Sequence, residues 1–450
     1  MTDATQVHGV EREGRSTPAR RGHWTVLERT LQYARERDYT GWDYSDGTSS
    51  RILRALPVDN RWINLAFQEV VKRSPVNVRP LFLVEQRRNY KGAALFTMAN
   101  LNAHDLLAGR VGDGSRRRSD HGGPTRVGER AADGVDYAAE ARSLAEWLVE
   151  HRCRGYSGFC GGHRHEVQHL HSKGVPNDSD VVSTTYAVQA LLAASRFDPA
   201  FAEVARTAAD FVVEDLNYRE VDGGAKIDYH MNHPDHVYTL NAGALGARLF
   251  VDLYERFGDD RLRERATRIL DYLVTKQTDV GGWMYREPAD SSHLSMDNHH
   301  NGFIVESFQR YRAVVDPDRY QHTLDRALSF YREEMFDDDG APNFDESNAY
   351  PRDIHAAAQG ILVFSYAGEF EVAERILEWT LRNLYAGEGR FYYRKHRLYT
   401  RRITLMRWCQ AWMAYAVSEY LRALASDERE PAGAGGGPGS GSEYADVKES

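Results

Sequence analysis

The sequence has few cysteines and no long apolar segment. Three of its 450 residues are cysteines (Cys153, Cys160 and Cys409). This odd, sparse set argues against a disulfide scaffold and suits a reducing compartment. No run of 18 apolar residues occurs, so we expect no membrane-spanning helix. The polar N-terminus lacks the apolar stretch of a secretory signal. Together these absences predict a cytoplasmic protein.

The sequence also has few lysines and no motif that binds nucleotide phosphates. Lysine occurs only seven times, and the formal net charge of −9 disfavours bulk binding of nucleic acid. Neither GxGxxG after a strand nor GxxxxGK[ST] is present, so neither NAD nor ATP is expected. We therefore predict no cofactor.

Three segments have the composition of solvated, irregular chain. Residues 1–23 are polar, residues 426–450 are rich in Gly, Pro and Ser, and residues 109–135 carry the charged, glycine-rich "GRVGDGSRRRSDHGGP". We expect disordered tails and a flexible insertion. Residues 24–425 remain as one folded domain.

Within this domain one unit repeats: a helix, a Gly-aromatic loop, a polar cluster and a second helix rich in small residues. The loops read "GYSGFCGG", "GGAKIDYH", "GGWMYREP", "GAPNFDES" and "GRFYYRKH". A degenerate first unit contains "YTGWDYSDGTSS". Six amphipathic helical hairpins predict an all-α fold, an (α/α)6 toroid with long loops at one mouth. An open α-solenoid is the alternative, but loops of about fifteen residues are long for compact connections unless they are functional.

The loops would bring aromatic side chains to the mouth, where they can pack on sugar rings or fill the loop core. These aromatic residues are Trp42, Tyr44, Tyr156, Phe159, Tyr229, Trp283, Tyr285, Phe344, Tyr392 and Tyr393.

Polar residues at the helix starts would meet at the same mouth. The set comprises Asp178, Asp180, Asn241, Asp297, Asn298, His299, His300, Asp353, His355, Arg401 and Arg402. Asp180, Asp297 and Asp353 suit N-caps, which accept hydrogen bonds from free backbone N–H groups. Several helix N-termini make a cavity positive, so with Arg79, Arg401 and Arg402 it would suit an anionic sugar such as a uronic acid.

Histidines are dense in two further stretches, but neither predicts a metal site. "GGHRHEVQHLHSKG" holds His163, His165, His169 and His171, and "DYHMNHPDHVY" holds His230, His233 and His236. No HExxH pattern is present. We expect loops lining the mouth and no metal.

"SMDNHHNGFIVESFQRY" (295–311) is the strongest candidate for chemistry. Asp297 would cap the helix, and His299 or His300 would transfer a proton near neutral pH together with Asp353 or His355. That arrangement suits a sugar epimerase. Alternatively, two carboxylates could act as the acid and base of a glycosidase. The candidates for that pair are Asp43, Asp46, Asp180, Asp297 and Asp353.

The motifs "YTGWDYSDGTSS", "SPVNVRPLFLVEQRRNYKGAALF" and "MDNHHNGFIVESFQRY" resemble a family of glycan-assembly proteins. The family includes AglQ of archaeal S-layer N-glycosylation and VpsJ of bacterial polysaccharide assembly. The resemblance covers roughly 24–425. It implies an (α/α)6 toroid related to six-hairpin glycosidases, which use paired carboxylates, and to N-acylglucosamine 2-epimerases, which use paired histidines.

The combined prediction is a sugar isomerase or epimerase of glycan biosynthesis acting on a hexuronic acid. A glycosyl hydrolase and a non-catalytic glycan-binding or scaffold protein are the alternatives. The expected partners are a sugar or lipid-linked oligosaccharide and other glycosylation enzymes. The predicted catalytic residues are His299, His300, Asp297, Asp353 and His355; the predicted substrate-binding residues are Trp42, Asp43, Asp46, Arg79, Asp180, Trp283, Tyr285, Arg401 and Arg402.

Overall fold

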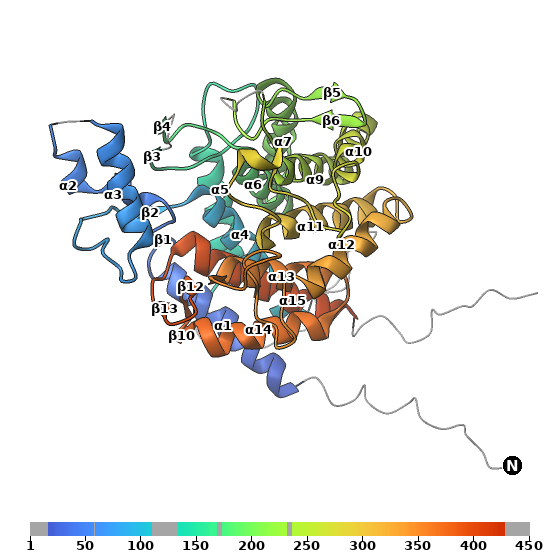
Figure 1. Ribbon diagram of the computed structural model, residues 1–450. Helices are drawn as coiled ribbons and strands as arrows, with labels where there is room; N and C mark the ends of the chain where they lie inside the picture. The colour runs from blue at the N-terminus through green and yellow to red at the C-terminus, as the bar shows by residue number, and fades with distance from the viewer. Residues whose placement is uncertain (1–16, 58, 110–133, 169–172, 232–235, 428–450) are drawn as a thin grey trace, which may run out of the picture.

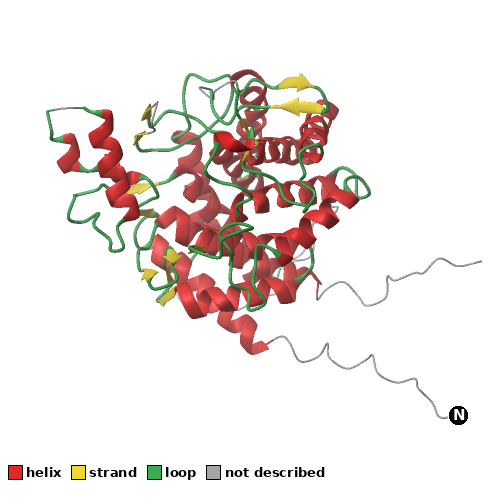
Figure 2. Cartoon of the chain, viewed as in Figure 1, coloured by secondary structure: helices red, strands yellow, loops and turns green. Residues whose placement is uncertain are grey.

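A computed structural model describes residues 17–57, 59–109, 134–168, 173–231 and 236–427 (Figure 1). Most of these residues are helical, and the strands are two or three residues long (Figure 2). Within the described ranges, no helix combines the length and the apolar character needed to cross a bilayer.

Six helices form a closed inner ring in the described part of the chain. They are α4 (Tyr90–Leu107), α6 (Val181–Ala194), α9 (Leu240–Phe257), α11 (Asn298–Val314), α13 (Ile354–Tyr366) and α15 (Trp412–Asp427). Each packs against the next in chain order, and α15 packs against α4 to close the ring. A π-helical turn, η4 (Met406–Ala411), leads into α15.

The outer layer pairs with this ring helix by helix. It consists of α1 (Thr17–Arg35), α5 (Tyr137–Glu150), α7 (Ala200–Arg206) with the short α8 (Ala208–Asp210) and η2 (Phe211–Asp215), α10 (Asp260–Val274), α12 (Gln321–Glu333) and α14 (Phe370–Leu384). Each outer helix contacts an inner helix, including α1 with α15. The outer helices are amphipathic: α10, for example, buries Leu262, Ala266, Ile269 and Leu273 at spacings of three and four. The predicted (α/α)6 toroid is confirmed.

Small residues allow the inner helices to approach closely. A Cβ added at Gly302 of α11 would lie 2.2 Å from Cγ of Gln359 on α13. One added at Gly360 would lie 2.2 Å from the Phe336 ring. The small residues in the predicted inner helices therefore mark crowded packing.

The loops between helices carry only short antiparallel ribbons. The pairs are β1 (Thr40–Gly41) with β2 (Arg87–Arg88), β3 (Val167–Gln168) with β4 (Lys173–Gly174), β5 (Arg219–Val221) with β6 (Gly224–Lys226), β7 (Tyr238–Thr239) with β8 (Arg286–Glu287), and β10 (Tyr385–Gly387) with β11 (Arg390–Phe391). β12 (Arg394–Lys395) lies between β9 (Arg352–Asp353) and β13 (Thr400–Arg401). A 3-10 turn, η3 (Ala289–Ser291), follows β8.

Between β1 and β2 the chain leaves the ring and forms a lobe, at the left of Figure 1. The 3-10 turn η1 (Asp46–Ser49) leads to α2 (Arg51–Arg54) and α3 (Arg61–Arg73). A bridge between Ser50 and Val84 closes its base. We call residues 51–83 the α2–α3 lobe.

The predicted tails and insertion fall mostly outside the described residues, so their disorder stays a prediction. The first helix, α1, begins at Thr17, within the predicted N-terminal tail. His23 of α1 is buried and lies 3.0 Å from Glu378 of α14. The folded domain therefore begins earlier than residue 24.

A buried ion pair links two inner helices. Arg248 of α9 donates to the Glu306 carboxylate of α11, and Gln359 of α13 donates to the other Glu306 oxygen at 2.7 Å. All three side chains are buried. Removing one charge from such a pair leaves the other without a counter-charge in a dry environment.

We predict that Glu306→Gln lowers the free energy of unfolding by about 3–5 kcal/mol, because the Arg248 guanidinium loses its main counter-charge. The matched control is Glu255→Gln on α9, which removes an exposed ion pair with Arg310 and should cost less than about 1 kcal/mol. Urea unfolding of both variants measures the difference. Equal, small effects would contradict a buried pair.

Candidate functional site

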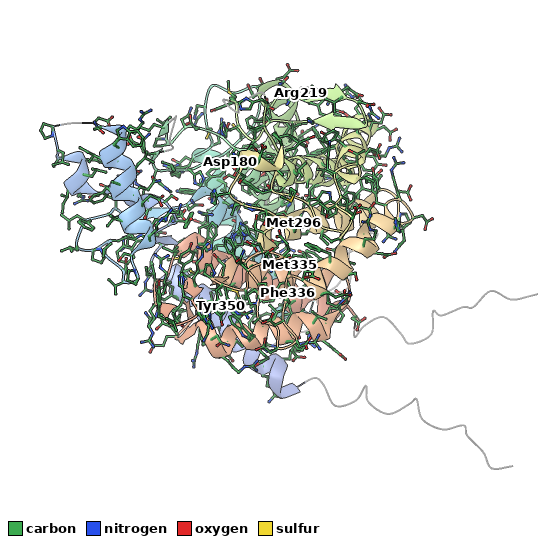
Figure 3. The ribbon with its side chains drawn as sticks, in the orientation of Figure 1. Asp180, Arg219, Met296, Met335, Phe336 and Tyr350 are labelled. Atoms are coloured by element: carbon green, nitrogen blue, oxygen red, sulfur yellow. The ribbon has the colours of Figure 1, made fainter. Side chains whose placement is uncertain are left out.

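The inner helices begin at one end of the ring, which we call the mouth. Asn89, Asp180, Asp297 and Asp353 cap α4, α6, α11 and α13, and each side chain accepts a backbone N–H of its helix. The three predicted aspartate caps are thus observed. Figure 3 labels Asp180 and Met296, beside the starts of α6 and α11, among the loops that surround the mouth.

A common position within each helix supplies most of the candidate groups. The second residue of α4 is Lys91, of α9 Asn241, of α11 His299, of α13 His355 and of η4 Arg407. The repeat therefore sets a similar register of polar groups around the mouth.

Three histidines form a cluster on α11 and α13. The rings of His299 and His300 have centroids 3.9 Å apart, and the His299 ring stacks on His355 at 4.5 Å. Nδ1 of His300 lies 2.8 Å, and Nδ1 of His299 3.2 Å, from the two Asp297 carboxylate oxygens. Asp297 therefore orients both imidazoles as well as capping α11.

Burial keeps two of these imidazoles neutral. It lowers the pKa of His299 well below its ordinary value, and the neighbouring His300 and His355 lower it further. Burial, followed by the charges of Lys91 and Arg407, lowers the pKa of His355 well below its ordinary value. A neutral imidazole can accept a proton.

His355 is only 1% exposed, yet neither of its ring nitrogens has a hydrogen-bond partner among the residues that the structure describes. Its ring lies 4.3 Å from the Trp412 ring and 4.7 Å from the Trp408 ring. Buried polar atoms almost always have partners. The two free nitrogens therefore mark a place where a ligand or water can bind.

Asp353 holds the residues around His355 in place through hydrogen bonds. Its carboxylate accepts from the His355 backbone N–H at 2.8 Å, from the Trp408 indole N–H at 2.8 Å and from Arg394 Nε at 2.5 Å. Three donors occupy it, so Asp353 holds its neighbours in place and is poorly suited to accept a proton. This differs from the predicted catalytic role.

A second group of charges lies at η4 and the start of α4. Asp43 accepts from Arg407 Nε at 2.9–3.0 Å and from Asn89 Nδ2 at 2.6 Å. Although burial alone would raise it, Arg407 lowers the pKa of Asp43 to about 2. Asp43 is therefore a buried anion that positions Arg407.

Lys91 is buried close to both groups. Its ammonium lies 5.8 Å from the Trp412 ring centroid, and no hydrogen bond to it is observed among the described residues. Burial, then repulsion from Arg407, lowers the pKa of Lys91 to about 7, against the attraction of Asp180 and Asp43. Near neutral pH this amine can be either charged or neutral.

The predicted arginine mouth is wrong in detail. Arg79 is buried in an ion pair with Asp46 at 2.8 Å, and it also donates to the Asp43 carbonyl. Arg401 donates to backbone carbonyls of Lys72 and Ser74. Both guanidiniums therefore hold the lobe against the ring and are not free for a carboxylate.

The remaining predicted residues lie in different places. Arg402 is exposed. Trp42 and Trp283 donate their indole N–H groups to the backbone carbonyls of Val84 and Leu273. Trp283 is fully buried against outer helix α10, so it belongs to the core and not to a sugar-binding surface. Tyr285, in contrast, lies 4.5 Å from the His300 ring, within the cluster.

The loop histidines divide between described and undescribed segments. Burial lowers the pKa of His163 and His165, and both interact with Asp43. Burial also lowers the pKa of His230, which interacts with Asp180. These three histidines therefore lie near Asp43 or Asp180, and their place in the wall of the mouth stays a prediction. The remaining candidates His169, His171 and His233 lie outside the described residues, and His236 is exposed.

One set of side chains has metal-ligand spacing in the described part of the chain. Ligand atoms of Asp297, His299 and His300 lie within 4.8 Å of one another. The Asp297 carboxylate already accounts for this geometry, because it forms a hydrogen bond with His300 Nδ1 and lies 3.2 Å from His299 Nδ1. The arrangement fits an Asp–His pair that orients imidazoles.

A small hollow of about 10 Å³, enough for one water molecule, lies beside Asp43 and His165, with Arg87 and Arg164 in its wall. His299 and His355 are not among its lining residues. Tyr44 stacks on Trp408 with ring centroids 4.8 Å apart, and the Trp408 ring lies 4.7 Å from the His355 ring. His355 is buried, whereas His299 and His300 are partly exposed.

Sequence reasoning missed Lys91, Arg407, Arg394 and Trp408 as parts of the site. Lys91 and Arg407 stand two residues after Asn89 and Leu405, as His299 and His355 stand two residues after their caps. Counting from the cap would have found them.

Solved structures with this fold include carbohydrate-active proteins. A possible GH105 member from Salmonella enterica superposes with a TM-score of 0.56 at 12% identity, over 93% of this chain and 99% of that chain. An unsaturated glucuronyl hydrolase from Streptococcus agalactiae superposes with a TM-score of 0.54 at 12% identity, over 94% of this chain and 99% of that chain. A cellobiose 2-epimerase from Bacillus thermoamylovorans superposes with a TM-score of 0.52 at 15% identity, over 74% of this chain and 87% of that chain.

At such identities these similarities show the (α/α)6 fold alone. No family model matches the chain, and no curated protein matches it in sequence.

We predict that Lys91→Met changes the pH dependence of stability. Because the folded pKa of about 7 lies below the unfolded value of 10.5, the unfolded state binds more protons between these pH values, so stability rises with pH. Over this window the wild type should gain about 2–5 kcal/mol relative to Lys91→Met. Urea unfolding from pH 6.5 to 10 measures this gain. Parallel pH profiles would contradict a buried amine.

Proposed function

We propose that the protein is a carbohydrate-active enzyme, a sugar isomerase or epimerase whose substrate is a hexuronic acid or a related sugar. The observation that carries the proposal is the pair His299 and His355. Both imidazoles are neutral, and in the described part of the chain both nitrogens of His355 lack hydrogen-bond partners. This is the state that a base needs to remove a proton from carbon next to a carbonyl or carboxylate.

His355 would take the C–H proton and become an imidazolium. The electron pair of that bond would form the C=C bond of an enediolate, with the negative charge on oxygen. Lys91, Arg407 and Arg394 act on His355 electrostatically and would stabilise this charge. Return of the proton to carbon would complete the reaction without a redox cofactor.

The stacking of the His299 and His355 rings limits which stereochemical course the reaction can take. Their centroids are 4.5 Å apart, so no sugar ring fits between His299 and His355. Inversion by two bases requires groups on opposite faces of the carbon. The side-by-side pair suits proton transfer between neighbouring carbons on one face, as in aldose–ketose isomerisation. His299, held by Asp297, would serve mainly to orient the His355 ring and to relay the proton.

We place this reaction in cytoplasmic glycan biosynthesis, with S-layer N-glycosylation as the setting. The resemblance of the motifs at 39–50, 74–96 and 296–311 to glycan-assembly proteins supports this setting. The substrate would then be a sugar or a lipid-linked oligosaccharide, and other glycosylation enzymes would be partners. The structural similarity to a cellobiose 2-epimerase and to a glucuronyl hydrolase is compatible with a sugar substrate.

A glycosyl hydrolase is the second candidate, and opposite pKa shifts of two neighbouring aspartates favour it. Burial raises the pKa of Asp46 to about 6, whereas Arg407 lowers that of Asp43 to about 2 against the effect of burial. Such divergence is typical of an acid and a base. However, an arginine occupies each of the two carboxylates, Arg79 on Asp46 and Arg407 on Asp43. Both ring nitrogens of His355, in contrast, have no hydrogen-bond partner among the described residues, so we favour the isomerase.

We predict that the purified protein introduces solvent deuterium into a hexuronate ring carbon in D2O, detected by NMR. His355→Asn should reduce this exchange by about 10²-fold or more, because general-base catalysis contributes about 10²–10⁴-fold. His299→Asn should reduce it less. His322→Asn on the exposed face of α12 is the matched control and should exchange as the wild type does.

Exchange that survives in both His299→Asn and His355→Asn would contradict the assignment. Release of a free sugar without exchange, lost in Asp46→Asn, would identify a hydrolase. Binding of uronates with neither reaction would identify a non-catalytic glycan-binding protein.

The biosynthetic setting predicts a second result. Deleting the gene should leave the mass of the glycan and its lipid-linked precursor unchanged while replacing one sugar by an isomer, as measured by mass spectrometry and sugar analysis. A normal glycan in the deletion strain would contradict the setting, whatever the purified protein does.

A further inference from the structure

The α2–α3 lobe concentrates the exposed apolar surface of the molecule. In the described part of the chain, fourteen large apolar side chains are exposed, and eight of them lie in this lobe. They are Ile52, Leu56, Trp62, Ile63, Val70, Val76, Leu81 and Leu83. Trp62 is 59% and Leu81 73% exposed. Scattered exposed apolar residues are ordinary, but such a gathering indicates a contact surface.

Helix α3 turns two polar side chains inward and leaves much of its apolar side exposed. It buries Asn64 and Gln68 together with Val71, and Gln68 bonds the backbone of Gln168 through both its amide N–H and its carbonyl oxygen. Trp62 and Val70 face solvent, with Ala66 between them at helical spacing. A helix in a water-soluble domain normally shows the reverse. The apolar stripe is therefore built for a partner.

Positive charge surrounds this stripe. Residues 51–83 carry six cations and two acids, a net charge of +4 in a chain of net −9. Buried Asp46 neutralises Arg79, and Glu85 forms ion pairs with Arg51 and Arg54, which leaves +2 on the exposed part. Arg54, Arg61 and Arg73 are exposed, and the Arg61 guanidinium lies 4.7 Å from the Trp62 ring centroid.

From this combination we propose that the α2–α3 lobe docks the protein on an anionic lipid surface. Exposed Trp and aliphatic side chains, flanked by arginines, suit the interface between headgroups and acyl chains. A second copy fits less well, because a two-fold contact would bring two positively charged surfaces together. The proposal does not depend on which sugar reaction the mouth performs.

The lobe lies at the rim of the mouth. The Lys72 ammonium of α3 is 4.8 Å from the Tyr44 ring centroid, and Tyr44 stacks on Trp408 over the histidine cluster. Arg401 holds the end of α3 through carbonyls of Lys72 and Ser74. Docking through α3 would therefore bring the mouth close to the lipid headgroups.

Sedimentation of the full chain with vesicles tests the proposal. The wild type should bind vesicles of phosphatidylcholine with about 30% phosphatidylglycerol, bind phosphatidylcholine alone at least about tenfold more weakly, and lose most binding when salt is raised from about 0.1 to about 0.5 M. The combined variant Trp62→Gln/Ile63→Gln/Val70→Gln should bind anionic vesicles at least about tenfold more weakly.

Two controls make the outcome decisive. Val280→Gln removes an exposed apolar residue from the ring and should bind as the wild type does. Arg61→Glu/Arg73→Glu should lose the preference for anionic vesicles. Circular dichroism should show the same helix content in every variant, since all these sites are exposed.

A wild type that stays in the supernatant overturns the proposal, as does a triple variant that sediments like the wild type. The expected wild type is a monomer in sedimentation velocity. A dimer that the triple variant converts to monomers would overturn lipid docking in favour of self-association through the lobe.

Discussion

Closure of the inner ring is the constraint on which the rest of the structure depends. When α15 packs against α4, residues from distant parts of the chain come into contact. Arg407 bonds Asp43 across a sequence separation of 364 residues. The caps and second residues of the inner helices then converge on one mouth, which an open solenoid would leave spread along a surface. Small residues such as Gly302 and Gly360 permit this closure because the helices approach within contact distance of their backbones.

The chemical character of the mouth follows from burial. Burial keeps the imidazoles of His299 and His355 neutral and favours the neutral amine of Lys91. The acidic groups around them hold fixed positions: Asp297 orients two histidines, and Asp353 receives three donors. The reactive groups are therefore held by partners that do not themselves react, as a preorganised site requires.

The repeat of Gly-aromatic loops and small-residue helices was sufficient to predict the toroid, because both patterns are local. The aspartate caps were predictable for the same reason. The partners of Arg79 and Arg401 could not be predicted from the sequence. Asp46 and the carbonyls at the end of α3 reach these arginines only through tertiary packing. Lys91 escaped notice as a lone cation in an otherwise apolar helix. The inverted burial of α3 also depends on its contact with Gln168, which lies 100 residues away.

The central claim is that His299 and His355 form a pair of neutral imidazoles at the mouth, with His355 buried and His299 partly exposed. The most direct measurement is a nitrogen-15 NMR titration of the histidine side chains, with resonances assigned through His299→Asn and His355→Asn. The account predicts that both imidazoles stay neutral as the pH falls through the ordinary histidine pKa of about 6.5, because both pKa values lie well below it. Titration of both groups near pH 6.5 would contradict it, because the pair would then be hydrated and the site would lack the neutral bases on which the proposed chemistry rests.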